Sequence, residues 1–241
     1  MKAGQRRLFV PNAVTAANIA VGFVSLVAAS EGRFRLAVYL LMGAILLDMA
    51  DGILARKLNA TSRFGQEMDS LGDALSFCAA PAFLVYQASL RSLEGVGVAI
   101  TTIYVLAGVF RLARFNLTSD AHEKSRWTTG MPTPIGAGYL MVVALMADEL
   151  PVAAAGSVVL AMALLMVSRL HLPELQGRGP VTMTLLVGLA NYFAVLVWTN
   201  WYTVAWWNAW NVVILLAARA ELRRRERLEE GPVEAEDLAQ V

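Results

Sequence analysis

The sequence predicts an all-α integral membrane protein, a bundle of about eight transmembrane helices with both termini in the cytoplasm. Three observations support this prediction. First, 57% of the 241 residues are hydrophobic and 16% are charged, whereas a soluble domain typically has about 25% charged residues. Second, apolar runs recur along the chain, and most approach the roughly 20 residues that a helix needs to cross the hydrocarbon core. Third, basic residues gather in alternate loops between these runs.

Eight apolar runs are candidate spans, and the linkers between them are short. The candidate spans are approximately Ala13–Ser30, Leu36–Ala55, Asp69–Leu90, Val96–Leu112, Pro134–Ala147, Pro151–Ser168, Val181–Trp198 and Thr203–Ala218. Five of the six tryptophans fall within residues 198–210, around the last non-cytoplasmic turn, where an interfacial aromatic belt is expected. Residues 1–218 are therefore predicted to form one transmembrane domain, followed by a charged cytoplasmic tail over residues 219–241.

The basic residues orient this layout. With eight spans, seventeen Lys and Arg residues fall on the side of the two termini, and three, Arg33, Arg35 and Arg91, fall on the other side. Because Lys and Arg are in excess in cytoplasmic loops, we expect a multi-pass protein of the cell membrane with both termini inside. The first span also has features of a signal peptide, and charge parity alone does not exclude its cleavage. We expect it to be retained as a span.

Composition excludes several kinds of site. The single Cys78 rules out an intrachain disulfide framework and a multi-cysteine metal site. The two histidines, His122 and His171, are 49 residues apart and do not have the spacing of zinc ligands. A formal net charge of +1 argues against a nucleic acid as the partner.

Four aspartates gather near the cytoplasmic ends of the second and third spans. Asp48 and Asp51 are three residues apart, and Asp69 and Asp73 are four apart, so each pair shares a helix face. At about 1.5 Å per residue, Asp51 and Asp69 lie about 7.5 Å, and the other two about 12–13.5 Å, from the ends of their helices. An antiparallel hairpin joined by residues 57–63 would set Asp51 opposite Asp69 and Asp48 opposite Asp73.

Such a cluster of carboxylates predicts a metal site. Ionisable residues inside spans are costly and usually functional. Bound cations would relieve the repulsion between the carboxylates, and oxygen ligands suit Mg²⁺ or Mn²⁺. Two such ions can hold both the attacking and the leaving oxygen of a phosphoryl displacement. The alternative is a set of loop-end ion pairs, between Asp51 and Arg56 or between Asp69 and Arg63, which would leave the matched depth of four aspartates unexplained.

The residues between the aspartates suit a nucleotide. Gly52, Ala55 and Gly65 extend the acidic helix faces with little bulk, which leaves room for a flat base or a phosphate. Arg56 carries a fork-shaped donor that suits a diphosphate.

Together these residues form one pattern, Asp48-x2-Asp51-Gly52-x2-Ala55-Arg56-x8-Gly65-x3-Asp69-x3-Asp73. The pattern resembles the signature of the CDP-alcohol phosphatidyltransferases in every residue and spacing. The resemblance implies that the chain cleaves a CDP-linked lipid, transfers the phosphatidyl group to an alcohol and releases CMP. It also implies a homodimer.

The resemblance implies roles by position. Asp48, Asp51 and Asp69 would bind one divalent cation, and Asp69 and Asp73 would take part in a second site, so two Mg²⁺ or Mn²⁺ ions are expected. Asp73 would also be the catalytic base on the acceptor hydroxyl. The residues that would surround the nucleotide are Gly52, Ala55 and Gly65 beside the cytidine and Arg56 at the diphosphate.

Two weaker signals concern the substrates. In Pro11-Asn12-x2-Thr15, at the start of the first span, Asn12 and Thr15 suit either nucleotide contact or helix capping; we predict nucleotide contact. The segments Phe110–Asn116 and Gly130–Pro134 resemble the serine-using branch of the family. That branch implies CDP-diacylglycerol and L-serine as substrates, and phosphatidylserine and CMP as products.

Arg111 and Arg114 are the predicted acceptor-binding residues. They are three residues apart at the cytoplasmic end of the fourth span, on one face, and could hold the carboxylate of serine or a substrate phosphate. Positive-inside anchoring explains them equally well.

Two other functions stay open. The acceptor could be glycerol phosphate or inositol phosphate, or the chain could be a membrane transporter, in which buried acidic residues lie near the midplane.

Overall fold

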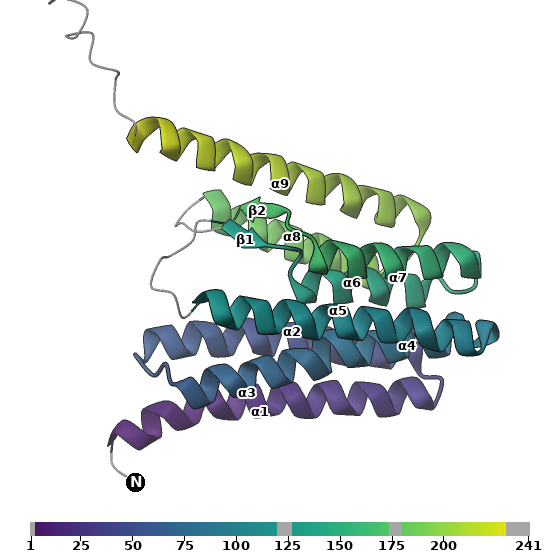
Figure 1. The fold of residues 1–241 in the computed structure, drawn as a ribbon, viewed down its shortest axis with the longest axis horizontal. Helices are drawn as coiled ribbons and strands as arrows, with labels where there is room; N and C mark the ends of the chain where they lie inside the picture. The colour runs from purple at the N-terminus through teal and green to yellow at the C-terminus, as the bar shows by residue number, and fades with distance from the viewer. Residues whose placement is uncertain (1–2, 120–126, 174–179, 230–241) are drawn as a thin grey trace, which may run out of the picture. The chain divides into compact units, whose positions relative to one another are not determined.

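The computed structural model describes residues 3–119, 127–173 and 180–229, and almost all of these residues are helical (Figure 1). The elements in chain order are α1 (Ala3–Ser30), α2 (Phe34–Lys57), α3 (Arg63–Asp73), the π-helix η1 (Ala74–Ala79), α4 (Ala80–Ala88), the 3₁₀-helix η2 (Leu90–Leu93), α5 (Gly95–Ser119), β1 (Trp127–Thr129), α6 (Thr133–Leu145), α7 (Val152–Val167), β2 (His171–Pro173), α8 (Pro180–Val197) and α9 (Trp201–Glu229). The two three-residue strands, which pair with each other, were not predicted.

The helices confirm the predicted class of a helical, membrane-embedded protein. Four stretches of the described chain are long and apolar enough to cross a membrane: Phe9–Ser30, Phe34–Lys57, Arg63–Ala88 and Gly95–Leu117. Three further apolar helical stretches of the described chain are shorter, namely Thr133–Leu145, Val152–Val167 and, within α8, Val187–Val197. The count of eight spans and the orientation of the termini therefore stay predictions.

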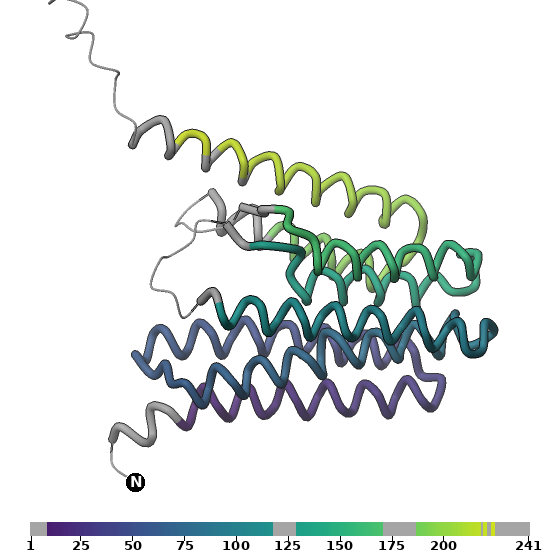
Figure 2. The backbone as a smooth tube through the Cα atoms, in the orientation of Figure 1, coloured from purple at the N-terminus to yellow at the C-terminus, as the bar shows by residue number. Residues whose placement is uncertain are grey.

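The described residues form two compact units, the first over residues 3–119 and 129–170 and the second over residues 127–128, 171–173 and 180–229. In the first unit, α1 and α2 pack along each other, α3 and α4 lie against α1, and α5 packs against α7 and η1 (Figure 2). In the second unit, α8 packs against α9. There the rings of Tyr192 and Trp207 lie 5.3 Å apart between centroids, and Trp206 Nε1 donates to Asn191 Oδ1 over 3.1 Å.

The turn between α2 and α3 has local sequence causes. After α2 ends, the Ala60 N–H donates to the carbonyl of Ala55 over 2.9 Å, which closes the helix end. Ser62 then caps α3, because its Oγ accepts a hydrogen bond from the Gly65 N–H over 3.0 Å. The helix therefore begins at Arg63, ahead of its apolar part, and the chain reverses within the predicted 57–63 connection.

The third long helix is interrupted directly after Asp73 by the π-helix η1. Short π segments are frequent at functional sites. Pro81 follows in α4 and has no N–H to donate to the Phe77 carbonyl one turn earlier. The buried Tyr104 of α5 donates its hydroxyl to that carbonyl over 3.2 Å. This bond ties α5 to the irregular segment beside Asp73.

We expect Tyr104→Phe to lower the stability of the protein by about 1 kcal/mol, the usual net value of one hydrogen bond. Thermal unfolding of the purified protein in detergent would measure the change. Tyr39→Phe is the matched control, because Tyr39 is exposed on α2, and it should unfold at the wild-type temperature. Equal shifts for the two variants would contradict a structural role for the Tyr104 hydroxyl.

Candidate active site

Three of the predicted metal ligands converge between two helices. Asp48 and Asp51 lie on α2 and Asp69 lies on α3, and one carboxylate oxygen from each lies within 4.8 Å of the others. Asp73 lies one turn further along α3, close enough to Asp48 and Asp69 to interact with both electrostatically. The hairpin thus brings together the four aspartates that the sequence pattern singled out.

The surroundings of these carboxylates fit a divalent cation. All the converging ligand atoms are oxygens, the ligand type that Mg²⁺ and Mn²⁺ prefer. Asp69 Oδ1 and Asp73 Oδ1 are buried, and neither has a hydrogen-bond partner among the described residues. Buried polar atoms are normally paired. Within the described part of the chain, the Asp51–Arg56 and Asp69–Arg63 ion pairs of the alternative interpretation do not form.

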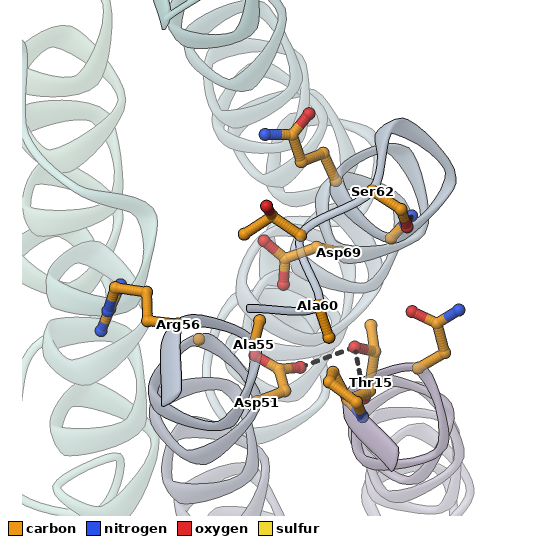
Figure 3. Close-up of a pocket in the computed structure, with 13 residues that line it drawn as sticks. Thr15, Asp51, Ala55, Arg56, Ala60, Ser62 and Asp69 are labelled. Carbon is orange, nitrogen blue, oxygen red and sulfur yellow. Dashed lines mark hydrogen bonds between the residues drawn. The ribbon is translucent and has the colours of Figure 1, made fainter. Parts of the chain in front are cut away.

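A cavity of about 180 Å³ opens beside the cluster, between α1, α2 and α3 (Figure 3). Its lining includes two of the aspartates, Asp51 and Asp69, and all six residues predicted to surround the nucleotide. These six are Asn12 and Thr15 from α1, Gly52, Ala55 and Arg56 from α2, and Gly65 from α3. Residues that were widely separated in the sequence, above all those of α1, therefore share one pocket with the carboxylates.

Gly65 permits the close approach of α1 and α3 at this pocket. A Cβ at position 65 would lie 3.1 Å from Asn12 Oδ1 and 3.2 Å from Ser62 Oγ, so a larger side chain would push these neighbours apart. The Arg56 side chain is exposed, and in Figure 3 its guanidinium points away from Asp51 and Asp69. A contact between Arg56 and a diphosphate stays a prediction.

The two arginines of α5 have different surroundings. Arg111 is 8% exposed, stacks over the Phe115 ring at 5.1 Å and interacts electrostatically with Asp73. Its Nε has no hydrogen-bond partner in the described structure. The Arg114 guanidinium instead donates to backbone carbonyls around the end of α7 and strand β1. These are Thr129 at 2.9 Å, Val167 at 3.1 Å, and Met166 and Ser168 at 3.2 Å.

Some residues at the site were not predicted as functional. Thr61, Ser62 and Gln66 line the cavity, and the turn that caps α3 is the signal that could have pointed to them. Thr133, at the start of α6, is fully buried, and its hydroxyl has no partner among the described residues. It belongs to the Gly130–Pro134 segment, whose residues resemble those of the serine-using branch.

A model of the CDP-alcohol phosphatidyltransferase family matches residues 8–170. The chain belongs to this family. The matched region contains α1 to α7 from Leu8 onward, and with them every residue placed at the site above. The aspartates of this CDP-alcohol phosphatidyltransferase family member therefore lie on the part of the chain that the family shares.

Curated relatives are similar to this chain over part of their length. A CDP-diacylglycerol–serine O-phosphatidyltransferase from Helicobacter pylori is 35% identical over 139 residues, which are 58% of each chain. An archaetidylserine synthase from Methanothermobacter thermautotrophicus is 31% identical over 175 residues, 72% of this chain and 73% of the relative. A CDP-diacylglycerol–serine O-phosphatidyltransferase from Bacillus subtilis is 34% identical over 56% of this chain and 74% of the relative. The chain thus spans little more than half the length of the Helicobacter relative.

Proposed function

We propose that this chain transfers the phosphatidyl group of CDP-diacylglycerol to the hydroxyl of L-serine, forming phosphatidylserine and CMP. The observation that carries this proposal is the convergence of Asp48, Asp51 and Asp69 within 4.8 Å, beside a pocket lined by the other residues of the family signature. Serine is supported as the acceptor by relatives whose names specify serine or archaetidylserine, and by the Phe110–Asn116 and Gly130–Pro134 segments.

In the proposed mechanism, Asp48, Asp51 and Asp69 would hold one divalent cation, and Asp69 and Asp73 would contribute to a second. Two Mg²⁺ or Mn²⁺ ions bound there would stabilise the charge that develops on the diphosphate oxygens. The pocket formed by α1, α2 and α3 holds the cytidine, with Gly52, Ala55 and Gly65 leaving room for it. With the cytidine bound there, the diphosphate would lie beside the carboxylate cluster.

Asp73 and Arg111 form the proposed acceptor side of the site. They lie on α3 and α5 and interact electrostatically, and each has a buried polar atom without a partner in the described residues. Asp73 accepts the proton of the serine hydroxyl as the serine oxygen bonds to the lipid-side phosphorus. The bond between that phosphorus and the bridging oxygen of the diphosphate breaks, and this oxygen leaves with CMP. Arg111 binds the serine carboxylate, for which its guanidinium is suited. The Arg114 guanidinium, occupied by backbone carbonyls, supports the fold.

The charge pattern supports a proposal for the setting of the site. We propose an eight-span homodimer in the cell membrane, with the aspartate cluster opening toward the cytoplasm, where CDP-linked lipid and serine would both reach it. The seventeen-to-three division of the basic residues and the positive-inside rule support this orientation.

Release of CMP tests the proposal against a transporter. Purified protein in detergent, given CDP-diacylglycerol and Mg²⁺ or Mn²⁺, should release CMP when serine is added. A transporter would bind or move its solute without breaking the diphosphate. Serine-independent CMP release at the same rate would indicate hydrolysis and would contradict the transfer to serine.

Asp73→Asn should separate the base from the metal ligands. A positioned base typically contributes about 10²–10⁴-fold to the rate, so the transfer rate should decrease by about that factor. CDP-diacylglycerol should still bind in the presence of metal. Binding measured by equilibrium dialysis with a labelled substrate would show the difference. If binding and transfer fall together and extra metal partly restores both, Asp73 acts mainly as a ligand. Wild-type transfer would remove both roles.

Arg111→Ala should raise the KM for serine more than the KM for CDP-diacylglycerol. Arg111→Lys should restore serine binding only in part, because an ammonium cannot make the bidentate contact of a guanidinium. Arg114→Ala is the matched comparison. It should lower the unfolding temperature, because four backbone carbonyls lose their donor, and leave the ratio of the two KM values unchanged. Equal KM effects of Arg111→Ala on both substrates would contradict the acceptor role.

A further inference from the structure

A hydroxyl on the first helix contacts the carboxylate cluster. Thr15 Oγ1 of α1 donates to Asp51 Oδ2 of α2 over 2.7 Å, the bond drawn between these two residues in Figure 3. Thr15 is 4% exposed and Asp51 is 6% exposed, so both partners of the bond are buried. Hydrogen bonds to a charged acceptor in such surroundings are shorter and stronger than those between neutral groups.

The proton of the Thr15 hydroxyl has two possible acceptors. Besides Asp51, the backbone carbonyl of Pro11 lies 3.2 Å from Thr15 Oγ1, one turn earlier in α1. The Asp51 carboxylate is nearer and charged, so it is the better acceptor. A hydroxyl has a single proton to donate, and the geometry directs it across the helix pair to the aspartate.

We propose that Thr15 is a positioning residue for the metal ligand Asp51. Its hydroxyl holds one oxygen of the carboxylate and so restrains the side chain with which Asp51 joins Asp48 and Asp69 in the three-oxygen cluster. This inference rests on the proposed metal-dependent function. It also changes the expectation for Thr15 from nucleotide contact to support of a ligand.

The expected size of the effect follows from known metal sites. Groups that hydrogen-bond to a ligand fix its orientation, and their loss typically costs about 10- to 100-fold in metal affinity or activity. Thr15→Val keeps the approximate shape of the side chain and removes the donor. Thr15→Ser keeps the donor and removes a methyl group. The two variants therefore distinguish the effect of losing the hydroxyl from the effect of altered packing between α1 and α2.

Mn²⁺ binding to the full-length protein, measured by electron paramagnetic resonance without lipid or serine, tests the proposal directly. Thr15→Val should bind Mn²⁺ about 10- to 100-fold more weakly than wild type, and Thr15→Ser should largely restore the affinity. Thr101→Val is the matched control, because Thr101 is also buried and also donates to a carbonyl one turn earlier, that of Gly97 at 2.9 Å, but in α5 and at no carboxylate. It should bind Mn²⁺ like wild type.

Wild-type Mn²⁺ affinity in Thr15→Val would overturn the positioning role while leaving the proposed reaction intact. Equal weakening in Thr15→Val, Thr15→Ser and Thr101→Val would also overturn it, because loss of packing would then be the cause. If Thr15→Val cannot be purified, the smaller Thr15→Ala has the same expected result. Failure of the wild-type protein to bind Mn²⁺ would overturn both the metal site and the role of Thr15, and is thereby distinguished from failure at Thr15 alone.

Discussion

Removal of divalent cations by EDTA should abolish phosphatidyl transfer, and added Mg²⁺ or Mn²⁺ should restore it. Three carboxylate oxygens from Asp48, Asp51 and Asp69 lie within 4.8 Å of one another, and without cations their charges repel. The diphosphate of the substrate is also negative, so the bare cluster would oppose its approach. The measurement is CMP release from CDP-diacylglycerol in the presence of serine, before and after chelation.

The control is an unfolding curve recorded in EDTA, which should show that the protein is still folded when it is inactive. Restoration of activity by fresh Mg²⁺ or Mn²⁺ would also show that the chelated protein had not been irreversibly unfolded. Full activity in excess chelator would contradict the metal site and with it the assignment of the three aspartates.

Asp48→Asn should lower the transfer rate by more than about 100-fold. Loss of a group that only supports a metal ligand typically costs about 10- to 100-fold, so loss of a ligand should cost more. An amide has nearly the shape of the carboxylate but no charge, so α2 and α3 should still pack together. The variant should unfold near the wild-type temperature and be nearly inactive.

Asp148→Asn is the matched control for this variant. Asp148 is exposed after the end of α6 and lies outside the cluster, so the same chemical change there should leave the rate as it is in wild type. The Mn²⁺ affinity of Asp48→Asn should fall together with its activity. Wild-type activity in Asp48→Asn would show that this aspartate is not a ligand.

The sequence predicted the carboxylate cluster because helical geometry is regular. Pairs of aspartates three and four residues apart share a face, and the short 57–63 connection lets α2 and α3 reverse direction. The structure has both features, with α2 ending at Lys57 and α3 beginning at Arg63. Asp51 and Asp69 could therefore be expected to meet without knowledge of any long-range contact.

Contacts between distant helices could not be predicted in this way. Arg111 and Arg114 share a face of α5, yet Arg114 donates to carbonyls around the end of α7, which periodicity within one helix does not reveal. Thr15 and Asp51 are 36 residues apart, and their hydrogen bond depends on how far α1 is shifted along its axis relative to α2. Within the π-helix after Asp73, the Phe77 carbonyl accepts a hydrogen bond from the Tyr104 hydroxyl of α5, another contact between distant parts of the chain.

Identification of the lipid product from a mixture of acceptors is the sharpest test of phosphatidyl transfer to serine. Purified protein would receive CDP-diacylglycerol, a divalent cation and equal concentrations of serine, glycerol phosphate and inositol phosphate, and mass spectrometry would identify the alcohol that becomes lipid-linked. We expect phosphatidylserine in amounts equal to the CMP released, and less than about one hundredth of that amount in the same time with Asp48→Asn. A product that carries glycerol phosphate or inositol phosphate in place of serine would contradict the assigned acceptor, and the absence of any lipid-linked alcohol would contradict the transfer itself.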